Sequence, residues 1–263
     1  MIKGAFTMSG KKKKKINKNK MKKYNDKKIN ELKEHIEEFC DIFGFDLDNK
    51  SYTIELAGLD DSLEKIEAAG ITYPPTSEND SFRIVINTKM KMSKQSRIEA
   101  AVHELTHMQD MIRYKKITNE DKYETLRDCN KYLMFQMWTE FNAYWKSYYY
   151  TVHSNLDESL VDVKQVCLND IIKIAEYSRE SINSIHDQLS QLYSIFSFMG
   201  HIYAWNKIEP EIFNKSLISS IFSQNENLIS VYEFLCKNND LESAHKNFDE
   251  LRKILNNIYK GIY

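Results

Sequence analysis

The sequence predicts an α+β fold, in which a small mixed sheet and a long helix precede a mainly α-helical C-terminal part. Three runs typical of strands lie between residues 51 and 88. The segment 98–114 has apolar residues at the i, i+3, i+4, i+7 spacing of an amphipathic helix. Beyond residue 150 the chain has helical periodicity, with breaks near 154–155, 209–210, 224–226 and 238–240.

The first elements follow in order along the chain. Residues 25–43 form an amphipathic pattern that Gly44 ends. Residues 51–56 alternate as a strand does, and residues 59–69 predict a short helix. A short strand at 71–73 leads into Pro74 and Pro75, and 81–88 is the clearest strand. Ser93 or Ser96 can cap the helix that comes next.

Composition divides the chain into three parts. Residues 1–28 contain twelve lysines and one acid, so we expect a disordered tail. It either contacts nucleic acid or another anionic surface, or serves only as a solubilising tail. Residues 29–150 contain the predicted sheet and the long helix, and 151–263 predict a helical bundle.

The chain as a whole has the composition of a soluble globular protein, with 42% hydrophobic and 29% charged residues. No apolar run has the length of a membrane span, and no secretory signal is evident, which predicts a cytoplasmic protein. The four cysteines are widely spaced, so we expect buried thiols rather than disulfides.

The long helix contains the motif His103-Glu104-Leu105-Thr106-His107. Histidines four residues apart lie one above the other on a helix, so both imidazoles can reach one cation. The apolar stripe faces the opposite way, towards the core. The structural alternative is two solvated or hydrogen-bonded helix histidines, but the motif favours a metal site with one Zn²⁺ per chain.

A catalytic zinc ion needs a third protein ligand. No third histidine follows the motif closely, so a carboxylate from a later segment is required. The candidates are Glu140, which lies in an aromatic, largely apolar helical segment, and Glu124 or Asp128 from the polar segment before it.

The motif, followed by Glu140-x-x-Ala143, resembles the gluzincin metallopeptidases, and among them the ImmA/IrrE-like proteins and minigluzincins. The resemblance covers roughly residues 52–150. It implies a zincin-like domain in which His103, His107 and Glu140 bind zinc and Glu104 is the general base. It also implies that the strand 81–88 borders the cleft and pairs with an extended substrate, although an ordinary strand fits the sequence equally well.

Further site residues remain open at this stage. Tyr144, which stands where thermolysin-type sites have an aspartate, Tyr148 and His201 are candidates for stabilising the oxyanion, with Tyr114 and His153 as alternatives. Asp110 can orient His103 or His107 by a hydrogen bond, or it can be a solvated helix residue.

These observations predict an intracellular zinc-dependent metallopeptidase of narrow protein or peptide substrate range, in which Glu104 activates a zinc-bound water. One alternative is a regulatory or scaffold protein with a zincin fold and weak or no activity. The other is a nucleic-acid-associated protein with a structural zinc site, recruited by its lysine-rich tail.

Overall fold

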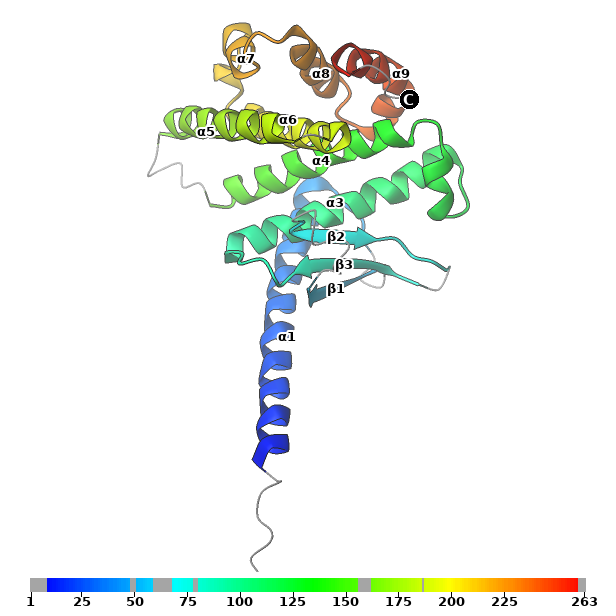
Figure 1. Ribbon diagram of the computed structural model, residues 1–263, viewed down its shortest axis with the longest axis vertical. Helices are drawn as coiled ribbons and strands as arrows, with labels where there is room; N and C mark the ends of the chain where they lie inside the picture. Colours follow the sequence, from blue (N-terminus) through cyan, green and yellow to red (C-terminus); the bar gives the residue numbers. More distant parts are fainter. Residues whose placement is uncertain are drawn as a thin grey trace, which may run out of the picture.

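The computed structural model describes residues 9–47, 51–58, 68–77, 80–155, 162–185 and 187–259. It is an α+β structure in which a three-stranded sheet lies against one side of a stack of helices (Figure 1). This arrangement confirms the predicted class of a small mixed sheet followed by a mainly helical part.

The sheet consists of β1 (Tyr52–Ala57), β2 (Gly70–Tyr73) and β3 (Phe82–Asn87) in the order β1-β3-β2. β3 is parallel to β1 and antiparallel to β2. The strand expected to pair with a substrate, 81–88, is therefore the central one, and that expectation is wrong. Both of its edges are already hydrogen-bonded within the described sheet, so only β1 and β2 present a free edge.

The two helices at the centre are α3 (Lys94–Thr118) and α4 (Tyr132–His153), which pack against each other. Ser93 caps α3, because its side chain accepts a hydrogen bond from the main-chain N–H of Ser96. α3 ends at Asn119, which adopts a left-handed conformation with φ of 56°. A short 3₁₀ helix, η1 (Glu124–Asp128), connects the two.

The C-terminal helices in the described part are α5 (Val163–Ser184), α6 (Gln188–Ile208), α7 (Lys215–Ile221), α8 (Glu226–Lys237) and α9 (Leu241–Ile258), with a 3₁₀ turn η2 (Pro210–Ile212). The four predicted breaks agree with helix boundaries, whereas the break between α5 and α6 was not predicted. α6 lies along α4, and the indole N–H of Trp138 on α4 donates to the carbonyl of Asn238, which follows α8.

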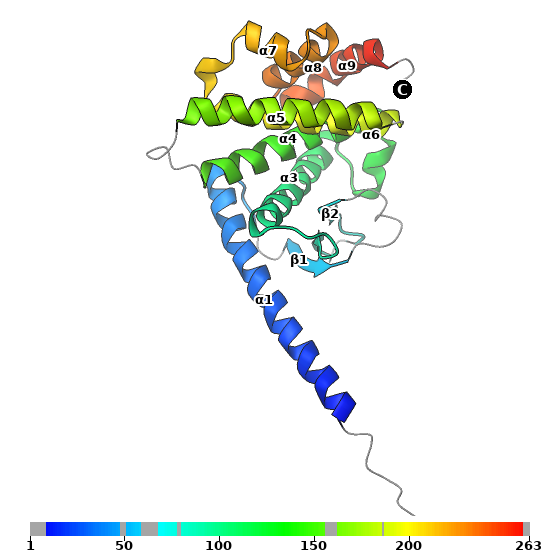
Figure 2. The ribbon, with the colours of Figure 1, turned by 60° about the vertical axis from the view of Figure 1, so that its left-hand side comes forward.

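The N-terminal helix α1 (Ser9–Phe43) packs its C-terminal part against α3 and β1 and projects away from the rest of the chain (Figure 2). It includes residues 9–28, for which the sequence predicted disorder. The stretch from residue 11 to Phe43 has no proline or glycine and is rich in lysine, a good helix former. Residues 1–8, and 59–67 of the short helix predicted at 59–69, lie outside the described residues.

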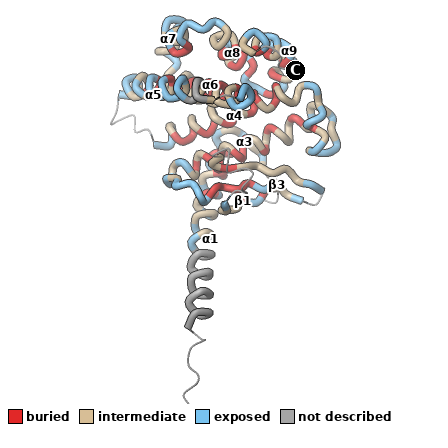
Figure 3. Tube along the Cα trace, in the orientation of Figure 1, coloured by how far each residue is buried: buried red, intermediate tan, exposed pale blue. Residues whose placement is uncertain are grey.

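Two clusters of buried apolar side chains stabilise the structure. One joins the sheet, α1 and α3; the other joins α4 to the C-terminal helices. Buried residues occur both in the sheet and in the helices that pack on it (Figure 3). Met111 of α3 and Tyr123, just before η1, pack against both clusters. None of the helices in the described part is long and apolar enough to cross a membrane.

Candidate metal centre

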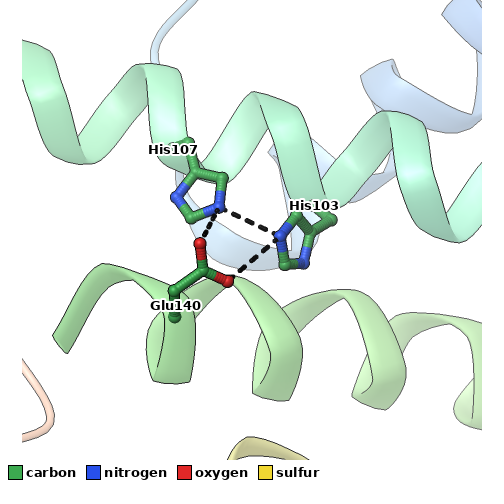
Figure 4. Close-up of side chains that lie close together, drawn as sticks. All are labelled: His103, His107 and Glu140. Carbon is green, nitrogen blue, oxygen red and sulfur yellow. Dashed lines mark hydrogen bonds and ion pairs between the residues drawn. The ribbon is translucent and has the colours of Figure 1, made fainter. Parts of the chain in front are cut away.

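His103 and His107 of α3 face Glu140 of α4, and the three side chains point towards one another (Figure 4). The two Nε2 atoms are 3.0 Å apart. Nε2 of His103 lies 3.7 Å from Oε2 of Glu140, and Nε2 of His107 lies 3.5 Å from Oε1. Glu140, not Glu124 or Asp128, therefore joins the two histidines. No other group of three such residues in the described part of the chain is close enough to hold a metal ion.

The distances fit a tetrahedral ion. Ligand atoms at the 2.0–2.1 Å typical of zinc–nitrogen and zinc–oxygen bonds stand roughly 3.3 Å from each other in a tetrahedron. The Nε2–Nε2 separation of 3.0 Å is close to that value, and so are the 3.7 and 3.5 Å from the two nitrogens to Glu140, which reach different oxygens of its carboxylate. Two imidazoles and a carboxylate also leave a fourth position unfilled by protein, as catalytic zinc sites do.

Desolvation favours the uncharged forms of these three side chains. Desolvation raises the pKa of Glu140 to about 8, with a further contribution from the nearby Glu104 carboxylate. Desolvation lowers the pKa of His107 to about 4, and desolvation and the neighbouring His107 lower that of His103. The imidazoles are thus neutral, and a divalent cation would displace the proton from Glu140 and the one shared between the two Nε2 atoms.

A chain of hydrogen bonds fixes the tautomer of His107. The hydroxyl of Thr139 donates to Oδ2 of Asp110 at 2.7 Å and lies 3.1 Å from Nδ1 of His107. A hydroxyl has one proton, which Asp110 accepts, so Thr139 is the acceptor from Nδ1–H of His107. The proton on Nδ1 leaves Nε2 of His107 as the lone pair that faces Glu140.

Asp110 itself is held in place. It is buried, and Asn142 donates to its carboxylate at 2.8 and 3.0 Å. Desolvation raises the pKa of Asp110, whereas the charge of Lys146 and the hydrogen bonds from Asn142 and Thr139 favour the ionised form. Asp110 therefore supports His107 through Thr139 rather than by direct contact.

Replacing Thr139 with Val should weaken zinc binding by roughly 10- to 100-fold, the usual cost of losing a hydrogen bond that orients a ligand. Valine has the same shape but cannot accept the Nδ1–H of His107. Competition with a chromophoric chelator would measure the affinity. Thr139→Ser, which keeps the hydroxyl, is the matched control and should bind zinc as wild type does. Equal affinity for all three proteins would rule out the orienting role.

Glu104 lies beside the ligand group and is anchored to the sheet. The hydroxyl of Thr72 on β2 lies 2.9 Å from Oε2 of Glu104 and 2.7 Å from its main-chain carbonyl. Gly70 faces the same side chain, and a Cβ there would stand 2.8 Å from Cγ of Glu104. Desolvation raises the pKa of Glu104 to about 7, against the lowering effect of the Thr72 hydrogen bond.

The site opens into a cleft of about 1240 Å³. β2 borders it on one side, and one face of α3, from Ser96 to Met111, forms its floor. η1 contributes Leu126 and Arg127, residues 90–92 before α3 line another part, and α4 and α6 contribute most of the rest. A peptide-sized molecule therefore has room to reach the three candidate ligands.

Of the residues predicted to stabilise the oxyanion, one borders the ligand group and the others have hydrogen-bond partners of their own. The Tyr144 ring packs against His103, with ring centroids 4.5 Å apart, and borders the cleft. The Tyr148 hydroxyl donates to Asp170, so its proton is already used. Nδ1 of His201 lies 2.9 Å from the Ser197 carbonyl, to which it donates. The roles predicted for Tyr144, Tyr148 and His201 stay predictions, and Tyr144 is the one beside the ligands.

The two alternatives lie elsewhere. Tyr114 is fully buried, stacks on Phe135 at 4.0 Å and leaves its hydroxyl without a hydrogen-bond partner in the described structure. His153 stacks on Tyr149 near the end of α4. Neither side chain borders the cleft.

Sequence reasoning missed several side chains that hold the site together: Thr72, Gly70, Thr139 and Asn142. Thr139 could have been suspected, because it directly precedes Glu140. Thr72 and Gly70 carried no signal, since only the tertiary structure brings β2 against α3.

Comparison of the chain with protein-family models, with curated proteins and with solved structures finds no match. The functional argument therefore depends on the geometry of the candidate metal centre.

Proposed function

We propose that this chain is a zinc-dependent metallopeptidase. The observation that carries the proposal is the position of Glu104: a buried carboxylate with a pKa of about 7 stands beside two neutral imidazoles and a carboxylate at metal-binding distances. A general base works best when its pKa lies near the operating pH. A zinc ion held by His103, His107 and Glu140 would supply a Lewis acid and acidify a water molecule.

The chain's own residues would manage the proton. Glu104 takes the proton of the attacking water and later gives it to the leaving amine. Thr72 keeps the Glu104 carboxylate in place by a hydrogen bond. Tyr144, next to His103 at the cleft wall, is the candidate for donating a hydrogen bond to the developing oxyanion.

A free strand edge supports a peptide as the substrate. The main-chain N–H of Asn87 donates to the carbonyl of Ala69 at 2.9 Å, which fixes the phase of the β2–β3 ladder. In antiparallel pairing, hydrogen-bonded and non-bonded pairs alternate, so Gly70 and Thr72 direct their N–H and C=O groups away from β3. These groups lie on the free edge of β2, beside Glu104, where an extended peptide can pair with them.

The test is zinc content together with peptide cleavage by the full-length chain. We expect one zinc ion per chain by elemental analysis. We also expect cleavage in a peptide mixture followed by mass spectrometry. Dialysis against a chelator should abolish the cleavage and added zinc should restore it, because the Lewis acid is removed and returned.

Glu140→Gln is the matched control, because it keeps the side-chain shape and removes the ligand charge. It should neither retain zinc nor cleave. Cleavage that persists after the chelator, or wild-type protein that takes up no zinc, would contradict the proposal.

A further inference from the structure

Glu99 is a second acid in the cleft that the ligand group does not use. It lies on α3 one turn before His103, on the same face of the helix, and borders the cleft. Four residues of α-helix rise about 6 Å, so Glu99 stands about one helical turn away from His103. It lies close to the wall formed by α4, since its charge acts on the hydroxyls of Tyr144 and Tyr148.

The Glu99 carboxylate lacks a partner. In the described part of the chain it makes neither a hydrogen bond nor an ion pair, and burial alone raises its pKa to about 7. Two cations also border the cleft, Lys91 and Arg127, but neither perturbs Glu99. Glu99 is half-buried, and an acid withdrawn from water normally has a partner, so a partnerless one in a cleft suggests a partner that comes with the ligand.

The charges around the ligand group point the same way. A divalent ion would balance the carboxylates of Glu104 and Glu140, which leaves Glu99 as the acid on this wall of the cleft without a countercharge, and a cation beside it would favour its ionised form. A cationic group would be attracted there, and an anionic group would be repelled.

We propose that Glu99 forms a subsite for a basic side chain, lysine or arginine, next to the scissile bond of the substrate. The inference rests on the proposed peptidase function, because that function makes the ligand of the cleft a peptide. A lysine side chain extends roughly 6 Å from its Cα, which matches the one-turn separation between Glu99 and His103. The carboxylate can accept charge-assisted hydrogen bonds from the ammonium or guanidinium group.

The test uses zinc-loaded protein and four hydroxamates, whose hydroxamate group binds the metal. Two carry lysine: one is Nα-acetyl-lysine hydroxamate, and the other is a succinyl hydroxamate coupled to lysine amide, so that lysine lies on either side of the metal. Two carry norleucine, which lacks only the ammonium group, in the same places. In wild type, one lysine probe should bind about tenfold more tightly than its norleucine counterpart, as for one charge-assisted contact. Glu99→Gln should remove this preference without changing affinity for norleucine. Isothermal titration calorimetry measures all the affinities.

Arg127→Gln is the control, because it removes a cleft charge from η1 rather than from the wall beside His103, and it should keep the lysine preference. Equal affinities for lysine and norleucine probes in wild type, or a preference that survives Glu99→Gln, would overturn the subsite. Failure of the peptidase proposal is recognised separately. A protein that prefers lysine probes but hydrolyses no peptide has the subsite without the activity, and one that cleaves with no basic preference has the activity without the subsite.

Discussion

Glu104→Gln should retain zinc, and its rate of peptide hydrolysis should be lower than that of wild type by roughly 1000-fold and by at least about 100-fold. This is the range that general acid–base catalysis contributes. Glutamine keeps the shape of the side chain and can still contact Thr72, but it cannot take a proton from the attacking water. His103, His107 and Glu140 are unchanged, so zinc content should stay at the wild-type value. Elemental analysis and a fluorogenic peptide assay on the same preparations give both values.

Thr72→Val is the companion variant, because it removes the hydroxyl that contacts Oε2 and the main-chain carbonyl of Glu104 and leaves the carboxylate group itself intact. Its hydrolysis rate should fall between those of wild type and Glu104→Gln, with zinc content unchanged. If Glu104→Gln hydrolysed peptides at the wild-type rate with zinc bound, Glu104 would not be the base.

Between pH 6.5 and 8 the metal-free protein should lose stability as pH rises. Three acids of the cleft release their protons within this window in the folded state, since desolvation raises the pKa to about 8 for Glu140 and to about 7 for Glu104 and Glu99. The same acids are ionised in the unfolded chain above about pH 4.5, so the folded state binds more protons in this window. The free energy of unfolding should therefore fall, by on the order of 2 kcal/mol from pH 6.5 to 8.

The histidines do not mask this trend. Their lowered pKa values make stability rise with pH until the unfolded imidazoles, with a pKa of about 6.5, have lost their protons near pH 7.5, and this rise offsets only part of the loss from the three acids. Zinc should reverse the trend, because its binding requires an ionised Glu140 and strengthens with pH. Urea unfolding at pH 6.5, 7.2 and 8.0, with chelator or with saturating zinc, measures both slopes.

Glu140→Gln tests the assignment of this pH dependence, since it removes the acid with the highest pKa of the three. The metal-free variant should show a shallower loss of stability than wild type, and zinc should have little effect on it. A metal-free wild type whose stability is constant or rises from pH 6.5 to 8 would show that these acids are ionised in the folded protein.

Local sequence patterns predicted the elements of this fold well. The periodicity of 98–114 placed both histidines on one face of α3, and Ser93 caps that helix as its hydroxyl allowed. The strands and the four predicted helix breaks lie where turn residues interrupt the apolar patterns, and the break between α5 and α6 gave no such signal. These features depend on residues within a few positions of one another, which is why the sequence could predict them.

Contacts between distant segments could not be predicted in the same way. Spacing left Glu124, Asp128 and Glu140 open as the third ligand, and only the packing of α4 on α3 brings Glu140 to His103 and His107. Similarly, 81–88 is the clearest strand in the sequence, yet β3 is the central strand and β2 borders the cleft. Strand order depends on tertiary pairing, which the alternation of side chains does not encode.

The sequence by itself determined that His103 and His107 share one helical face with Glu104 beside them, because the 3.6-residue period of an α-helix fixes their relative positions. Only the tertiary structure decided which groups from other elements surround that face: Glu140 and Thr139 come from α4, and Thr72 comes from β2. It also left Glu99 of α3 in the same cleft without a partner among the described residues. The burial that shifts the pKa values of these acids and histidines arises only when α3, α4 and the sheet pack together and exclude water.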